Sequence, residues 1–321
     1  MTTFDTTANA HPPARPAASG PSGTRPRRPG SQSRAQRRAA YAFVLPFMLL
    51  FVAMLVVPLG YALYLSLFAD RLIGGSVFVG VQNYADVLGD ALFRDGVARV
   101  AVFLLVQVPI MLALALVFAL ALDSNRLRWV KAVRLGIFLP YAVPSVVAAL
   151  MWGYLYGPDF GPIAQSFRAL GAEPPDLLGD GWMLASIGNV VTWEFVGYNM
   201  IILYAALRSV PPELYEAAAV DGAGAIRTAW SVKIPSIRPA IVLTVVFSVI
   251  GSFQLFNEPQ VMRALAPDVI GSGYTPNLYA YTLAFTNQQL NYSAAVSFML
   301  GFVILVLTYI VLLVISRRNR R

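Results

Sequence analysis

Long apolar runs separated by short polar segments repeat along the chain from about residue 40 to residue 315. A helix needs about 20 predominantly apolar residues to cross the hydrocarbon core of a bilayer. The pattern therefore predicts an all-α integral membrane protein with six membrane-spanning helices. Their predicted ranges are about 40–68, 97–122, 135–156, 184–207, 239–262 and 294–315.

Two of these spans, the third and the fifth, are less apolar than the others. The third contains Pro140 and Pro144, and the fifth contains the polar stretch 254–259. Prolines and polar residues are tolerated inside a span where neighbouring helices or water satisfy the freed backbone groups. These two spans are therefore predicted to face other helices or a wet cavity more than lipid.

Both ends of the chain differ in composition from the spans. Residues 1–38 are rich in Ala, Pro, Ser, Gly and Arg, so they are predicted to form a disordered basic tail. The apolar stretch that follows is longer than the apolar region of a secretory signal peptide, and we expect it to remain as the first membrane helix. Residues 317–321 form a second, short basic tail.

The composition excludes several kinds of chemistry. Only 12% of the residues are charged, against about 25% in soluble proteins. The chain has no cysteine, its one histidine is His11 in the tail, and no Gly-Lys pair is present to form a phosphate-binding loop. We therefore expect no catalytic residue, no metal site and no cofactor on this chain.

The basic residues predict which way the spans are oriented. Most of the 24 lysines and arginines lie in the two tails, in the loop after the second span and in the loop 208–238. Basic residues favour the cytoplasmic side of a membrane, so both termini are predicted to be cytoplasmic in a multi-pass protein of the cell membrane. The net charge of +8 is explained in this way and does not indicate nucleic-acid binding.

The cytoplasmic loop 208–238 is predicted to form two short helices. Pro211 and Pro212 suit the first helical turn, and Glu213 and Glu216 add negative charge where the helix dipole favours it. Asp221-Gly222 ends this helix, because glycine adopts the left-handed cap conformation at little cost.

The second predicted helix begins at about Ala223 and ends at Ile234, before Pro235. Pro239 then begins the fifth span. Small and apolar side chains on such a loop would let the backbone of a partner approach closely.

The loop also resembles a known sequence motif. Glu216-Ala217-Ala218, then Asp221-Gly222-Ala223, then Ile234-Pro235, are similar to the EAA loop of binding-protein-dependent ABC importer permeases, which usually have Leu where this chain has Ile234. The resemblance implies a type I permease fold and a coupling helix that contacts a separate ATPase. The residues it assigns to that contact are Glu213, Glu216, Ala217, Ala218, Asp221, Gly222 and Ala223.

Further segments resemble the carbohydrate branch of this family, the maltose-, lactose- and glycerol-phosphate-type permeases. They include residues 79–84, Phe256-Asn257-Glu258 and residues 292–295, whereas Arg99-Val100 departs from the family's usual Asn-Thr pair. The resemblance implies a sugar as cargo. It also implies a second homologous permease, two ATP-binding subunits that hold ATP and magnesium, and an extracytoplasmic sugar-binding protein as partners.

Two ionisable residues inside the spans, Glu194 and Glu258, indicate a substrate path, because buried charge in a membrane is costly. Sugars bind to amide and carboxylate groups and to aromatic faces, and both are present nearby. Gly251, Gln254 and Glu258 are predicted to share one helix face. The candidate path residues are Trp193, Glu194, Tyr198, Asn199, Gly251, Gln254, Asn257 and Glu258.

Several alternatives stay open at this point. Glu194 and Glu258 could serve only as contacts between helices. The same importer class could carry glycerol phosphate, a polyamine, iron or phosphate, although the spans offer acids and amides rather than the basic groups that an anion needs. A secondary transporter would usually show an internal repeat, and an integral membrane enzyme would need a catalytic constellation; the sequence indicates neither.

Overall fold

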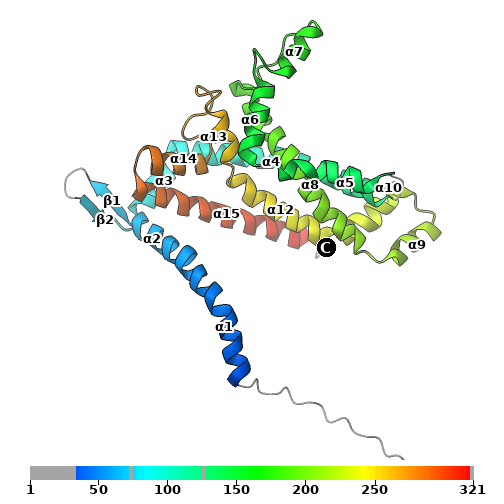
Figure 1. Ribbon diagram of the computed structural model, residues 1–321, viewed down its shortest axis with the longest axis horizontal. Coiled ribbons are helices and arrows are strands. Elements are labelled where there is room, and N and C mark those ends of the chain that lie inside the picture. Colours follow the sequence, from blue (N-terminus) through cyan, green and yellow to red (C-terminus); the bar gives the residue numbers. More distant parts are fainter. Residues whose placement is uncertain (1–33, 72–74, 125–127, 319–321) are drawn as a thin grey trace, which may run out of the picture. The chain divides into compact units, whose positions relative to one another are not determined.

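A computed structural model describes residues 34–71, 75–124 and 128–318 (Figure 1). The predicted disordered tail lies mostly outside these residues, but helix α1 (Arg34–Phe51) already begins at Arg34, before the predicted boundary at residue 38. The chain divides into two units, Met1–Val56 and Val57–Arg321. In the first unit α1 continues into a π-helical turn, η1 (Val52–Val56).

Five helical stretches are long and apolar enough to cross a membrane, judged by length and composition within the described residues. They match the first, second, fourth, fifth and sixth predicted spans. Their ranges are Arg38–Ser66, Ala91–Asp123, Asp180–Arg208, Arg238–Met262 and Leu290–Ile315.

The third predicted span is not one straight helix. It consists of α5 (Val130–Phe138), a 3-10 turn η2 (Leu139–Ala142) and α6 (Ser145–Tyr156), and the two arms are bent by 96°. Pro140 lies in the turn, and Pro144 caps α6 with an extended ψ of 132°. Proline disfavours the helical conformation of the residue before it, and Val143 before Pro144 is extended with a ψ of 129°, which explains the bend. Six spans result if the bent pair counts as one.

The fifth span is interrupted as well. Helix α12 (Arg238–Phe253) ends before Gln254, and α13 (Asn257–Met262) starts after a break at Phe256, whose φ and ψ are −143° and −52°. The prediction that Gly251, Gln254 and Glu258 share a face of one continuous helix is therefore wrong. Residues 254–257 follow the end of α12, and the carbonyls of Gln254 and Leu255 accept hydrogen bonds from the side chains of Asn277 and Thr275.

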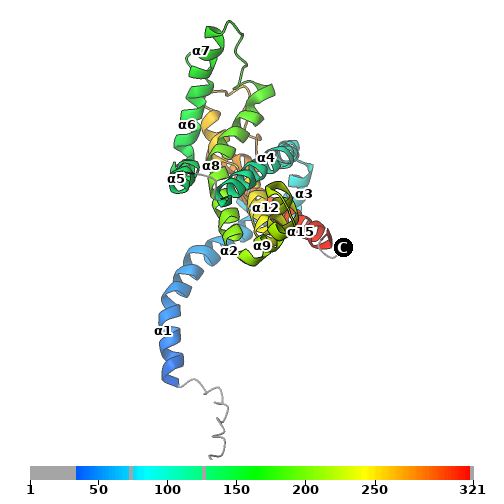
Figure 2. The same ribbon diagram turned by 90° about the vertical axis from the view of Figure 1, so that its right-hand side faces the viewer.

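The second unit is built around two long helices, α4 (Ala91–Asp123) and α8 (Asp180–Arg208), which pack along each other in parallel, with Gln107 against Thr192 and Met111 against Asn199. Helix α15 (Leu290–Arg318) packs against α12 and against α2 (Val57–Ser66). Helix α6 continues towards α7 (Pro162–Ala169), and both extend away from this bundle in Figures 1 and 2.

Smaller elements complete the fold at the end of the second unit that holds α3 (Gln82–Gly89) and α14 (Pro276–Tyr281) (Figure 1). The π-helical η4 (Thr282–Thr286) follows α14. Strands β1 (Phe68–Arg71) and β2 (Gly75–Phe78) pair antiparallel, with Phe68 opposite Phe78. This two-stranded sheet is an addition to the all-α architecture that the sequence predicts.

Candidate functional site

The loop between the fourth and fifth spans folds into an elbow, defined here as residues 212–236. Its first arm is α9 (Pro212–Val220), which begins at the two prolines as predicted. Gly222 has a φ of +71°, and the amide of Ala223 donates to the carbonyl of Ala218 at 2.9 Å. This is a left-handed helix stop, so the predicted role of Asp221-Gly222 in ending the helix is confirmed.

The second arm runs through α10 (Ala225–Thr228), the π-helical η3 (Ala229–Lys233) and α11 (Ile234–Ser236). The prediction that Pro235 ends this arm is wrong, because Pro235 lies inside α11. The wider π turn directly before Pro235 changes which amides pair with which carbonyls, so the missing N–H of the proline is accommodated. Helix α12 then starts at Arg238 and Pro239.

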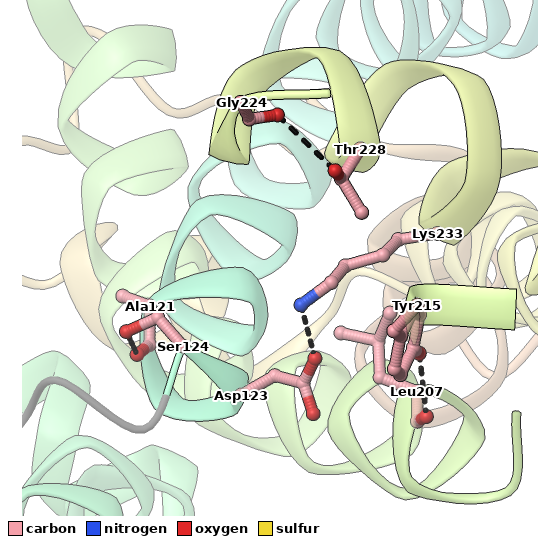
Figure 3. Close-up of polar contacts among 8 residues, drawn as sticks. All are labelled: Ala121, Asp123, Ser124, Leu207, Tyr215, Gly224, Thr228 and Lys233. Carbon is pink, nitrogen blue, oxygen red and sulfur yellow. Dashed lines mark hydrogen bonds and ion pairs between the residues drawn. The ribbon is translucent and has the colours of Figure 1, made fainter. Parts of the chain in front are cut away.

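An ion pair anchors the elbow to the long helices (Figure 3). Lys233 Nζ lies 2.5 Å from Oδ2 of Asp123, the last residue of α4, and 5.0 Å from the ring centre of Tyr215. The Tyr215 hydroxyl donates to the carbonyl of Leu207 in α8 at 3.2 Å. Burial and the charge of Asp123 raise the pKa of Tyr215, so its hydroxyl stays protonated at neutral pH.

The elbow residues assigned by the sequence are mostly on the surface. Five of them are exposed, Ala223 is half-buried, and Ala218 is buried with 8% of its surface accessible, so Ala218 packs the elbow instead of presenting a contact. The exposed residues are Glu213, Glu216, Ala217, Asp221 and Gly222.

Sequence reasoning missed three large apolar side chains on the elbow, Val220, Ile226 and Trp230. They are 89%, 78% and 70% exposed. Exposed large apolar side chains typically mark an interaction site when they form a contiguous patch. Their signal in the sequence was large apolar residues close to the turn glycines Gly222 and Gly224 in a predicted cytoplasmic loop.

A cavity of about 370 Å³ lies between α4, α8, the 139–145 bend and the interrupted fifth span. Six of the eight predicted path residues line it, so the break in the fifth span still brings its polar residues to one place. They are Tyr198, Asn199, Gly251, Gln254, Asn257 and Glu258. Other lining residues are apolar or aromatic and include Phe103, Met111, Phe195, Phe247 and Phe256.

The other two predicted residues, Trp193 and Glu194, do not line this cavity. Trp193 packs edge-on against Trp152 of α6, with ring centres 5.9 Å apart. Glu194 is buried, with 3% of its surface accessible, and its Oε2 has no hydrogen-bond partner among the described residues. Glu194 is therefore buried in α8 and does not line the cavity.

Sequence reasoning also missed Tyr141, which sits in the proline turn and forms one aromatic wall. Its ring stacks on Tyr198 at 4.9 Å and meets Phe195 edge-on at 5.8 Å. Gly197 permits this approach: a Cβ there would lie 2.8 Å from the carbonyl carbon of Ile137 and from the Cα of Phe138. The sequence feature that could have identified Tyr141 is an aromatic residue between two prolines inside a predicted span.

Hydrogen bonds hold the polar wall of the cavity in place. Asn257 Nδ2 donates to the Ser145 hydroxyl at 2.7 Å and links the fifth span to α6. Asn199 Nδ2 donates to the carbonyl of Phe195 at 3.0 Å. Among the described residues that line the cavity, Glu258 is the one charged side chain, and none is Lys, Arg or His. The lining suits a neutral ligand with many hydroxyl groups and apolar faces.

Comparison with known proteins decides the family. Residues 111–321 match the model of the family described as binding-protein-dependent transport system inner membrane component. This chain belongs to that family. The permease is 31% identical to the lactose transport system permease protein of Rhizobium radiobacter, over 84% of this chain and 91% of the relative. It is 32% identical to the sn-glycerol-3-phosphate transport system permease protein of Shigella flexneri, over 84% of this chain and 91% of the relative.

A solved structure, that of a bacterial ABC transporter involved in import of the acidic polysaccharide alginate, shares the fold of the permease. The TM-score is 0.77 at 19% identity, with 88% of this chain and 96% of that chain covered. The predicted type I fold and the predicted membership of the ABC importer permeases are confirmed.

The end of the permease opposite the elbow is fastened by a single carboxylate. Asp90 Oδ2 accepts hydrogen bonds from Tyr279 at 2.6 Å and Tyr292 at 3.0 Å, and Oδ1 caps α4 through the amide of Leu92 at 2.9 Å. Burial raises the pKa of Asp90, but these hydrogen bonds outweigh it and hold the pKa below its ordinary value. The charged Asp90 thus joins α4, α14 and α15.

The same end of the permease holds an arginine on an aromatic ring. Arg99 of α4 lies over the ring of Tyr274 at 4.5 Å and donates to the Tyr274 carbonyl at 3.0 Å. Burial raises the pKa of Tyr274 to about 12, so the ring stays neutral. Arg99, which departs from the family's usual residue at this position, thus contacts the segment between the fifth and sixth spans.

Proposed function

We propose that this permease forms the translocation path for a neutral oligosaccharide and that its elbow couples the path to a separate ATPase. The observation that carries the cargo assignment is the lining of the 370 Å³ cavity. The stacked Tyr141 and Tyr198 offer flat faces to sugar C–H groups, and Gln254, Asn257 and Glu258 offer partners for hydroxyl groups.

The relatives support this assignment without fixing the sugar. One relative is named for lactose, a neutral disaccharide, and another for glycerol phosphate, an anion. An anionic cargo would favour basic groups at the path, and the described cavity lining has none. Neutral sugar is therefore the better candidate, with glycerol phosphate as the second. A polyamine remains a third, because Glu258 would attract a cation.

The coupling part of the proposal concerns the elbow. The permease itself would catalyse no reaction, and ATP with magnesium would bind to two partner subunits. The elbow exposes the large apolar side chains of Val220, Ile226 and Trp230 and the acidic side chains of Glu213 and Glu216, and such groups would suit a groove in such a subunit. Asp123 and Lys233 would then transmit movement of the elbow to α4.

Further partners and the orientation belong to the same proposal. A second permease would complete the path, and an extracytoplasmic binding protein would deliver the sugar; the family description supports the binding protein. The elbow would face the cytoplasm together with both termini, because most basic residues lie on that side.

The test uses the intact importer, purified through a tag on this chain and reconstituted into liposomes with ATP supplied on the elbow side. Uptake of neutral di- and trisaccharides is compared with uptake of glycerol 3-phosphate and spermidine. We expect ATP-dependent uptake of a neutral sugar, lowered in Tyr141→Ala, Gln254→Ala and Glu258→Ala. Preference for glycerol 3-phosphate or spermidine would contradict the cargo assignment, and wild-type uptake by all three variants would contradict the path.

A further inference from the structure

Three aromatic rings form a continuous row next to the central cavity. The ring centres of Phe256 and Tyr281 are 4.9 Å apart, and those of Tyr281 and Phe285 are 4.8 Å apart. The row joins three elements: the break after α12, the end of α14 and the π turn η4. The sequence alone does not single out any of its members as a path residue.

The row connects the central cavity to a second hollow. Phe256 lines the 370 Å³ cavity and also lines a hollow of about 330 Å³. Exposure increases outward along the row, since Phe256 is half-buried, Tyr281 is 38% exposed and Phe285 is 71% exposed. The remaining lining residues of the hollow are small or polar: Asn277, Ala280, Ala284, Ser293 and Ser297.

Core packing explains only one member of the row, because Phe256 packs against a buried cluster whereas Tyr281 and Phe285 belong to none of the described clusters. The opposite side of the same helical segment supplies Tyr279 and Leu283 to the buried core, where they are 7% and 3% exposed. Tyr281 and Phe285 are not part of that core. An exposed aromatic ring costs free energy in water, and three in contact form a ready surface for an apolar face of a ligand.

Polar groups beside the rings fit the same kind of ligand. Asn277 Nδ2 donates to the carbonyl of Gln254 at 3.1 Å, so the hollow and the polar wall of the cavity are tied together. The hydroxyls of Ser293 and Ser297 donate to backbone carbonyls at 2.7 and 2.9 Å, which leaves their lone pairs free to accept. Flat aromatic faces with hydroxyl and amide groups at the edge are complementary to a pyranose ring.

We infer that Phe256, Tyr281 and Phe285 form an access track on which a neutral sugar ring stacks before it reaches the central cavity. This inference rests on the proposed function of the permease. The track lies at the end of the second unit opposite the elbow, where α14 is seen in Figure 1. Sugar would pass from Phe285 to Tyr281 and then to Phe256, which belongs to both hollows.

The first experiment measures ATP-dependent uptake by reconstituted importer with the neutral sugar that wild type transports best. Phe285→Ala and Tyr281→Ala are expected to raise the KM for sugar about 3- to 10-fold with little change in maximal rate, as loss of one aromatic contact predicts. Tyr281→Phe keeps the ring and should restore the wild-type KM. Phe160→Ala is the control, because Phe160 is 76% exposed and shares no ring contact among the described residues.

The second experiment uses the absence of cysteine from the chain. Phe285→Cys introduces one thiol, whose reaction with a maleimide is followed on the band of this subunit. Saturating sugar is expected to slow the labelling several-fold, and sugar should not change labelling of Phe160→Cys. An unchanged KM in Phe285→Ala, or labelling that is equally blocked with and without sugar in the assembled importer, would overturn the track and indicate cover by a partner subunit.

The outcomes separate the two proposals. No ATP-dependent uptake of any neutral sugar by wild type would overturn the proposed cargo and the track together. Uptake by wild type with unaltered kinetics in both alanine variants would overturn the track alone.

Discussion

Lys233 in the elbow and Asp123 at the end of α4 are 110 residues apart in the sequence and form an ion pair of 2.5 Å. The Asp123 side chain is 5% exposed and that of Lys233 is 16% exposed, so water screens the pair little. The pair is the direct polar link between the elbow and the helix that lines the cavity. In the proposed function, this pair would pass movement of the elbow to α4.

Lys233→Met removes one partner and leaves Asp123 buried without its counter-ion. We expect the free energy of unfolding to fall by about 1–3 kcal/mol, between the values for exposed and buried ion pairs. We also expect sugar uptake per ATP hydrolysed to fall by more than this loss of stability explains. Lys131→Met is a matched control, because Lys131 is the other lysine of the chain and is exposed. The reversed pair, Asp123→Lys with Lys233→Asp, should recover part of the uptake. If the reversed pair recovers none, and Lys131→Met lowers uptake as much as Lys233→Met does, then the ion pair does not couple the elbow to α4.

Two glycines of the elbow provide a comparison. Gly222 has a φ of +71°, whereas Gly224 has a φ of −68°, and a Cβ added to either would meet no other atom within 4 Å. Gly222→Ala should destabilise the turn by about 1–2 kcal/mol and lower uptake, because only glycine adopts this φ without strain. Gly224→Ala should behave like wild type. Equal uptake by both variants would show that the shape of the turn is unimportant.

Two glycines of α8, Gly197 and Gly181, allow the effect of a helix–helix contact on stability to be separated from the effect of helix propensity. Gly197→Ala places a methyl group against the α5 backbone, which should cost about 1–3 kcal/mol and displace Tyr198 from Tyr141. Gly181→Ala, in the same helix with open space around it, should be neutral or stabilising by up to about 1 kcal/mol. Thermal unfolding of the purified importer measures both. A stable and active Gly197→Ala would contradict the close crossing of α5 and α8.

The carboxylate of Asp90 makes stability depend on pH. Its folded pKa lies below the ordinary value of about 3.9, so its contribution is present above about pH 4 and is lost as the pH falls through the folded pKa. Asp90→Ala should lower the melting temperature at pH 7, since it removes the acceptor for Tyr279 and Tyr292 and the cap of α4. The difference from wild type should shrink below pH 4. A difference that stays constant from pH 7 to pH 3 would show that the charge is unimportant.

The spans and the first arm of the elbow could be predicted from the sequence, because both depend on local properties. Apolar length identifies a membrane helix, and Gly222 identifies a helix stop, whatever the rest of the chain does. The second arm extends beyond its predicted end at Pro235, since a π turn accommodates a proline that an α-helix would not. The sequence carries no simple signal for such a turn.

The cavity could be predicted only in part. Tyr198 and Glu258 can be found from sequence because polar and aromatic residues are rare at that depth, but Tyr141 escapes prediction because it reaches the cavity through the 96° bend at the prolines. Trp193 is assigned to the path by its neighbourhood in sequence and Glu194 by its charge inside a span, and neither property tells which way a side chain points. Which side of α8 faces the cavity depends on packing against α4 and α6, and that packing is not local.

The central claim is that the elbow is the contact with a nucleotide-hydrolysing subunit. Val220 is 89% exposed at the tip of α9, so Val220→Cys supplies a single thiol in a cysteine-free chain for a photoreactive maleimide. After illumination of the intact importer in membranes, the crosslinked partner is identified by mass spectrometry. The account predicts a crosslink to the ATP-binding subunit; a crosslink elsewhere, or labelling of this thiol by an impermeant maleimide added outside intact cells, would contradict it.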